Sequence, residues 1–98
     1  MIFAELQYDE HYEVMHKKLS SYIKSNFGFV RSGLQCDSWI WIQEDGEKVE
    51  IDTFSAMVHQ IKTSNKESKL VHKVIEVLEK RYEIKVFNEP VLDPHEEN

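Results

Sequence analysis

Two carboxylates near the middle of the chain are the residues best placed to do chemistry. Glu50 and Asp52 stand two positions apart in an alternating run, so on a β-strand their side chains would point to the same side. Such a pair can bind a hard divalent cation or divide the roles of general acid and base between them. His59 follows seven residues after Asp52 and could approach it. One candidate site is therefore a small-ligand or divalent-metal site centred on Glu50, Asp52 and His59.

No stronger chemical motif accompanies these residues. Cys36 is the only cysteine, which excludes an intramolecular disulfide, and no activating base is near it in the sequence. His11 and His16 are five positions apart, the wrong spacing for a shared metal on one helix face. We therefore assign no catalytic residue, metal ligand or cofactor, and an enzymatic role is the less favoured interpretation. Four lysines recur at helical spacing, which indicates either a solvated helix face or a local patch that could bind anions. They are Lys62, Lys66, Lys69 and Lys73.

The composition is that of one small acidic domain. The chain has 98 residues, with 12 lysines and arginines against 18 aspartates and glutamates, for a net charge of −6. A hydrophobic content of 41% excludes wholesale disorder, and no apolar run is long enough to span a membrane. Glu5, Glu50 and Asp52 would repel phosphates, which argues against nucleic acid as a partner. With one cysteine and no basic, apolar leader at the N-terminus, the cytoplasm is the expected compartment.

Hydrophobic periodicity assigns residues 1–88 to a single domain. Residues 1–8 alternate as a strand, residues 9–27 have the apolar spacing of a helix, and a last strand begins at Ile84. Residues 89–98 hold two prolines and four acids, which predicts an acidic, mobile tail.

Three segments have less definite patterns. Residues 28–37 suit either a loop or a short edge strand at about 29–36. Residues 54–63 suit a single turn or an irregular crossover. Ser64 and Glu67 have the spacing of a capping box, which predicts that a second helix begins there.

The strongest local signal is a β-hairpin at residues 38–53. Asp45 and Gly46 separate two alternating runs, and this dipeptide suits a type I′ turn, in which both central residues need a positive φ. If Glu44 lies opposite Glu47, the register of the whole hairpin follows. Its pairs are then Ile42 with Val49, Trp41 with Glu50, Ile40 with Ile51, and Trp39 with Asp52. One face is aliphatic, and the other carries two tryptophans and two carboxylates.

The order of strand, helix, two strands, helix and strand resembles the ferredoxin-like β-α-β-β-α-β plait. The resemblance covers residues 1–88 and implies an α+β domain with a four-stranded antiparallel sheet and both helices on one face. An alternative adds the short edge strand at about 29–36. Such a fold does not by itself indicate a function.

Strand parity then divides the side chains between the two faces of the sheet. The helix-covered face is predicted to hold Ile2, Ala4, Leu6, Ile40, Ile42, Val49, Ile51, Ile84 and Val86. The helix-free face is predicted to hold Phe3, Glu5, Gln7, Trp39, Trp41, Glu50, Asp52, Lys85 and Phe87.

Large aromatic side chains on a helix-free face must be covered by something. Loops of the chain itself, a protein partner or a small molecule could cover them. We expect a protein, most simply a second copy of the chain, because tryptophan is enriched at interface hot spots. An acidic rim would favour a basic partner. The sequence therefore predicts a small acidic cytoplasmic interaction domain, self-associating as a homodimer, that binds through Phe3, Trp39, Trp41 and Phe87 with a rim of Glu5, Glu50 and Asp52.

Overall fold

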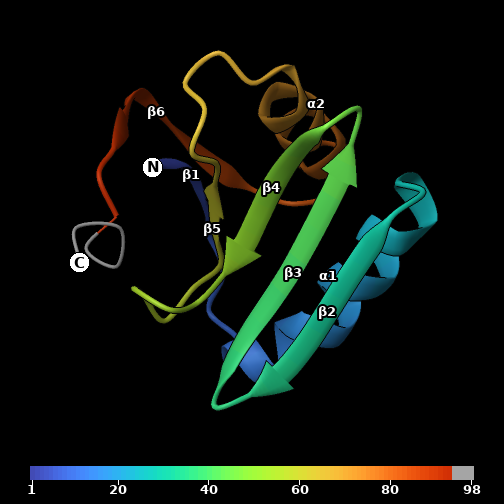
Figure 1. Cartoon of the computed structure of the whole chain (residues 1–98). Coiled ribbons are helices and arrows are strands. Elements are labelled where there is room, and N and C mark those ends of the chain that lie inside the picture. Colours follow the sequence, from blue (N-terminus) through green and yellow to red (C-terminus); the bar gives the residue numbers. More distant parts are fainter. Residues whose placement is uncertain (94–98) are drawn as a thin grey trace.

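The computed structural model describes residues 1–93, which form an α+β fold with one six-stranded antiparallel sheet and two helices (Figure 1). The strand order is β2-β3-β4-β5-β1-β6. Both helices lie behind the sheet in Figure 1, so one face carries the helices and the other carries none. The elements are β1 (Ile2–Leu6), α1 (Tyr12–Asn26), β2 (Val30–Gln35), β3 (Asp37–Glu44), β4 (Glu47–Asp52), β5 (Gln60–Lys62), α2 (Lys69–Glu79) and β6 (Ile84–Val91).

The sheet differs from the predicted four-stranded plait by two strands. Strand β2 lies at one edge, where the alternative with a strand at about 29–36 placed it. Strand β5 lies between β4 and β1, within the segment 54–63 for which a turn or crossover was expected. Helix α1 connects β1 to β2 and helix α2 connects β5 to β6, so each helix crosses over strands that lie between the two it joins.

The hairpin prediction is confirmed in its turn and in its register. Asp45 has a φ of 51° and Gly46 a φ of 80°, as a type I′ turn requires. The observed pairs run from Glu44 opposite Glu47 to Trp39 opposite Asp52 without a shift. Because the register is regular, the face assigned to every residue of this hairpin is also correct.

Strand β1 contains an irregularity that the sequence analysis missed. Ile2 lies opposite Lys62 but Ala4 lies opposite Ile61, so one extra residue is accommodated at Phe3. A bulge of this kind reverses the side-chain alternation beyond it. Phe3 consequently joins the helix-covered core and contacts the ring of His72 on α2, with ring centroids 6.4 Å apart. The prediction that Phe3 lies on the helix-free face is therefore wrong.

The hydrophobic core lies between the sheet and the two helices. Helix α1 packs on β2 and β3, and helix α2 packs on β4, β5 and β6. Val86 was predicted to belong to this core, but on the edge strand β6 it is 48% exposed. The buried strand residues of the core are Phe3, Ala4, Leu6, Ile40, Ile42, Val49, Ile51 and Ile61. The buried helix residues are Met15, Leu19, Ile23, Leu70, Val71, Val74, Ile75 and Leu78.

Helix α2 begins later than the predicted capping box. Ser68 is its N-cap, because the Ser68 hydroxyl accepts a hydrogen bond from the amide of Val71 at 3.2 Å. Lys62, the first lysine of the predicted helical stripe, lies instead on β5 and is buried. The stripe of four lysines on one helix is therefore wrong.

The C-terminal segment is held on the sheet further than the sequence suggested. Residues 89–91, which were assigned to a mobile tail, belong to β6. Asp93 is buried and forms an ion pair with Lys62 on β5. The rest of the predicted tail, residues 94–98, lies outside the described residues.

Candidate functional site

The helix-free face of the sheet, called here the open face, is divided into two parts. Over β4 and β5 its polar side chains are buried: Asp52 is 1% exposed, Gln60 7% and Lys62 3%. Over β3, Trp39 and Trp41 are only half-buried. Residues 1–93 therefore bury one part of this face and leave the part over β2 and β3 partly exposed.

Trp39 and Trp41 form a contiguous aromatic pair on the accessible part. Their ring centroids are 4.5 Å apart, with the planes inclined by 40°. Gly33 on β2 lies directly opposite Trp39, and a Cβ placed on Gly33 would come within 2.4 Å of the indole. The indole of Trp39 therefore lies over the backbone of Gly33 and extends to the edge strand.

Cationic side chains lie against these aromatic rings. The ammonium group of Lys48 is 3.9 Å from the centroid of the Trp41 ring, and the guanidinium of Arg31 is 5.5 Å from that of Phe29. Partly exposed contacts of this kind contribute about 0.5–1 kcal/mol each. Phe29, Trp39 and Trp41 are called here the aromatic strip.

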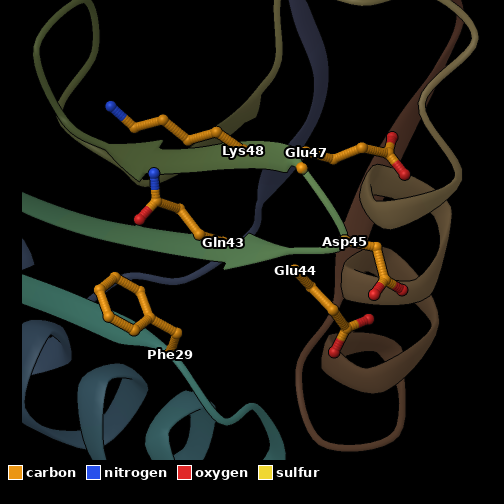
Figure 2. Close-up of a pocket in the computed structure, with 7 residues that line it drawn as sticks. Phe29, Gln43, Glu44, Asp45, Glu47 and Lys48 are labelled. Atoms are coloured by element: carbon orange, nitrogen blue, oxygen red, sulfur yellow. The ribbon is translucent and has the colours of Figure 1, made fainter.

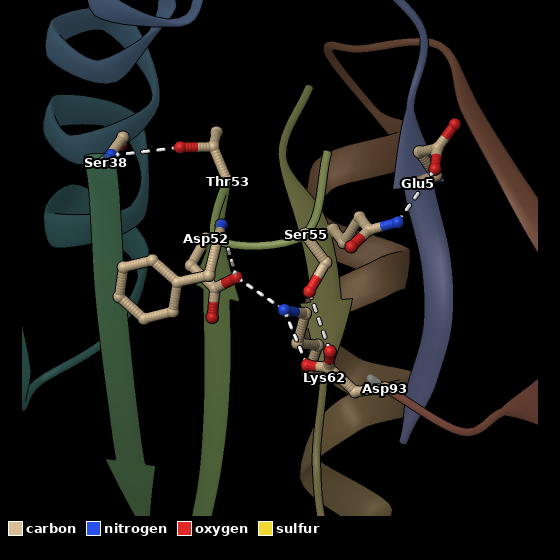
Figure 3. Close-up of polar contacts among 9 residues, drawn as sticks. Glu5, Ser38, Asp52, Thr53, Ser55, Lys62 and Asp93 are labelled. Carbon is tan, nitrogen blue, oxygen red and sulfur yellow. Dashed lines mark hydrogen bonds and ion pairs between the residues drawn. The ribbon is translucent and has the colours of Figure 1, made fainter. Parts of the chain in front are cut away.

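A buried ionic cluster occupies the covered part of the open face (Figure 3). The Lys62 ammonium lies 2.6 Å from Asp52 Oδ1 and 2.7 Å from Asp93 Oδ2. Ser55 donates a hydrogen bond of 2.7 Å to Asp93, and the Lys62 ammonium is 5.9 Å from the Phe54 ring centroid. The cluster thus connects the β4–β5 loop and the C-terminal segment to the centre of the sheet.

Burial and pairing compete in the ionisation of this cluster. Burial raises the pKa of Asp52 above its ordinary value, although Lys62 acts in the opposite direction. Burial alone would lower the pKa of Lys62, but its bonds to the two carboxylates raise it overall. Asp52 Oδ2 and Gln60 Oε1 are buried without a hydrogen-bond partner among residues 1–93. Gln60 also donates to Glu5 Oε2 at 3.0 Å, so Glu5 is engaged as well.

The residues predicted to form one interaction patch do not all lie together. Trp39, Trp41 and Glu50 are on the open face at β3 and β4, as hairpin parity predicted. Phe87 lies on β6, at the opposite end of the strand order from β2, and therefore does not adjoin the tryptophan pair. Phe3 is in the core. The prediction of a single patch of four aromatics is therefore wrong.

A buried hydrogen-bonded chain of polar side chains lies on the helix-covered side of the sheet. His59 is fully buried between Ser38, whose hydroxyl is 2.6 Å from Nε2, and Tyr8, whose hydroxyl is 2.7 Å from Nδ1. The Ser38 hydroxyl is also 2.6 Å from Nδ1 of His16 on α1. The sequence contained one signal for this buried hydrogen-bonded series. Ser38 is two positions from Ile40 on the predicted strand, so its side chain must point toward the core, as that of Ile40 does.

Only one direction of donation along this series of hydrogen bonds gives every donor in it an acceptor. Tyr8 accepts a bond from the backbone amide of His59 at 3.0 Å, so its own hydroxyl hydrogen is free for His59 Nδ1. His59 then carries its proton on Nε2 and donates to Ser38, and Ser38 donates to His16. In this arrangement the hydroxyls of Tyr8 and Ser38 and both ring nitrogens of His59 are satisfied with neutral groups.

The surroundings keep the histidines neutral. Burial lowers the pKa of His59 from 6.5 to about 4 and also lowers that of His16. Burial raises the pKa of Tyr8 to about 12. Ser38 is 0% exposed, so its hydroxyl cannot reach a substrate despite the adjacent bases. These side chains form a structural network that connects the segment after β1, helix α1, strand β3 and the residue that precedes β5.

The candidate site of Glu50, Asp52 and His59 is not assembled. Asp52 points to the open face and is paired with Lys62, whereas His59 is bonded on the helix-covered side. Glu50 lies 3.7 Å from Lys48. Within residues 1–93 there is no group of three or more His, Cys, Asp or Glu side chains arranged to hold a metal ion.

A depression beside the aromatic strip lies at the tip of the hairpin and has a volume of about 350 Å³ (Figure 2). Phe29, Gln43 and Lys48 line one part of it. Glu44 and Glu47 are directed toward α2, where Glu44 is 2.8 Å from the Lys73 ammonium and Glu47 accepts the Lys69 amide at 3.0 Å. These carboxylates therefore cap and anchor the helix and do not converge on a ligand position.

Comparison with known protein families, with curated proteins and with solved structures finds no match. No helix in the described part of the chain is both long and apolar enough to cross a membrane.

Proposed function

We propose that this protein is a small acidic interaction domain that associates with a second copy of itself through the open face. The observation that carries the proposal is the Trp39–Trp41 pair, whose ring centroids are 4.5 Å apart and which residues 1–93 leave only half-buried on the helix-free face. Tryptophan in such a position is typical of interface hot spots.

The charges of the open face favour a second copy over a strongly basic partner. The three acids of the predicted rim already have partners in the chain: Asp52 bonds Lys62, Glu5 bonds Gln60, and Glu50 lies near Lys48. Arg31 and Lys48 lie against the aromatic strip. This part of the face is therefore mixed in charge, and a mixed surface can complement itself across a two-fold axis.

The proposal retains the cytoplasm as the compartment, on the basis of the single Cys36 in the sequence. It assigns no catalysis and no cofactor. No observation favours the rival small-ligand or metal site, because Glu50 and Asp52 lie on the open face whereas His59 is bonded on the helix-covered side.

Light scattering coupled to size-exclusion chromatography tests the proposal. The wild type should show a mass that increases with concentration toward that of a dimer. Trp39→Ser combined with Trp41→Ser should remain folded and lose this association, because each hot-spot truncation typically costs at least about 2 kcal/mol. Val14→Ser is a matched control, since Val14 is 52% exposed on α1, away from the open face.

Two results would contradict the proposal. A wild type that stays monomeric at every concentration would exclude self-association. A double variant that associates as strongly as the wild type would show that the contact lies elsewhere.

A further inference from the structure

Strand β2 is an edge of the sheet that the described chain leaves open. It is the first strand in the order and pairs only with β3. Its six pairs with β3, from Val30 with Ile42 to Gln35 with Asp37, follow one another without a shift. A regular edge strand presents a row of unpaired backbone groups to any further strand.

The hydrogen-bond alternation identifies which backbone groups point outward. Gln43 donates to the carbonyl of Phe29, and Thr53 donates to that of Ser38. Odd-numbered residues of β3 therefore bond β2, and even-numbered ones bond β4. By the same alternation, the outward-pointing amides and carbonyls of β2 belong to Val30, Ser32 and Leu34.

The other edge of the sheet is protected in ways that β2 is not. Strand β6 contains Pro90, and its register with β1 shifts between the pair of Ala4 with Val86 and the pair of Ile2 with Val91. Proline and irregular pairing are the devices by which proteins block an edge. Strand β2, with the sequence VRSGLQ, has no proline, lysine or bulge.

We propose that two copies of the chain pair antiparallel along β2, about a two-fold axis at Ser32, so that their sheets become one. This inference rests on the proposed self-association and names its geometry. The register places Val30 opposite Leu34 of the second copy and Ser32 opposite Ser32. All three are residues with outward-pointing backbone groups, so each opposed pair can exchange hydrogen bonds in both directions.

The side chains of β2 fit this register on both faces. On the helix-covered side, Leu34 is 45% exposed, and the second copy's Val30 would cover it. On the open face, Arg31 would lie opposite Gly33, which has no side chain to obstruct it. The indole of Trp39 extends over Gly33 and would meet that arginine. The aromatic strip thereby becomes part of the dimer contact.

The local charge is compatible with such an approach. The chain carries a net charge of −6, which opposes association of two copies. Strand β2 itself contains no carboxylate, and Arg31 is its only charged residue. An edge strand without acids adds no like-charge carboxylate repulsion of its own to the approach of a second copy.

Proline at Ser32 tests the pairing directly. Ser32→Pro removes an outward-pointing amide hydrogen but none that bonds β3, so the monomer should keep its fold. We expect the dissociation constant of the dimer to rise at least about tenfold, measured by sedimentation equilibrium. Ser32→Ala is the matched control, because it also removes the 3.1 Å hydroxyl contact with Ser20 but retains the amide.

Leu34→Lys provides a second test that does not alter the backbone. Leu34 is already partly exposed, so a lysine there should be tolerated by the monomer, yet it would place a charge in the proposed contact. We expect it to weaken the dimer as Ser32→Pro does.

The possible outcomes separate the two proposals. If the Trp39 and Trp41 variant is monomeric while Ser32→Pro and Leu34→Lys dimerise as the wild type does, the open face associates without β2 and this inference is wrong. If the wild type is itself monomeric, the proposed function fails first. Loss of association in both Ser32→Pro and Leu34→Lys, with Ser32→Ala unaffected, supports pairing along β2.

Discussion

Acidification should destabilise this protein through His59 in particular. The pKa of His59 is 6.5 in ordinary surroundings and about 4 in the folded chain, because burial disfavours the charged ring. Because the pKa of His59 is lower in the folded chain, a fall in pH protonates His59 in the unfolded state before it protonates His59 in the folded state. Its contribution to stability is therefore fully present above about pH 6.5 and is lost as the pH falls toward 4.

The size of this loss follows from the two pKa values. A difference of about 2.5 corresponds to about 3 kcal/mol of unfolding free energy, a large fraction of the stability of a small domain. Protonation also requires His59 to donate from both ring nitrogens. The bond between His59 Nδ1 and Tyr8 would then reverse its direction, so the Tyr8 hydroxyl hydrogen would lose its acceptor, whereas the bonds from His59 Nε2 through Ser38 to His16 would keep theirs.

Urea unfolding at pH 7 and pH 4 measures the effect, with His59→Gln as the comparison. Glutamine can donate to Ser38 but does not titrate, so the variant should be less stable than the wild type at pH 7. Between pH 7 and pH 4 it should lose about 3 kcal/mol less than the wild type does, because the carboxylates and His16 titrate in both proteins. An equal loss in the two proteins would refute the assignment of the acid sensitivity to His59.

Two further substitutions examine the open face. Gly33→Ala should destabilise the fold by about 1–3 kcal/mol in a denaturant melt, since a Cβ there would come within 2.4 Å of the Trp39 indole, whereas Gly28→Ala, with nothing within 4 Å, should cost much less. Equal effects would mean that the indole does not lie over Gly33. Lys62→Met should cost about 3–5 kcal/mol because it removes the buried ammonium group that the carboxylates of Asp52 and Asp93 both bind, while Lys66→Met at an exposed position should be nearly neutral. A small cost at Lys62 would show that the two carboxylates are solvated or protonated.

The hairpin was predictable because its information is local. The Asp45-Gly46 turn determines the register, and the register assigns Trp39 and Trp41 to the open face. Strand β5 was not predictable in this way. Only Ile61 of its three residues is apolar, and the strand depends on pairing with β1 and β4 and on the ion pairs of Lys62 with residues far away in the sequence.

The error at Phe3 has the same origin. The alternation in residues 1–8 is regular in the sequence, but the bulge in β1 arises where that strand meets β5. A prediction that lacks β5 also lacks the bulge, and the face of Phe3 is then reversed. The buried partners of His59 were likewise beyond local reasoning, since Tyr8 and Ser38 approach it only after four elements have packed together.

The two parts of the open face differ in the side chains that lie on them and in how far the described chain covers them. Over β5, a lysine and two aspartates hold the chain's own loop and C-terminal segment on the sheet. Over β2 and β3 no such anchoring charges are present, and the surface is aromatic. Gly33 makes this surface continuous with the sheet edge, because a larger residue would prevent the Trp39 indole from crossing β2. Any strand that pairs with β2 must therefore also contact that indole, so the edge and the aromatic strip form one surface.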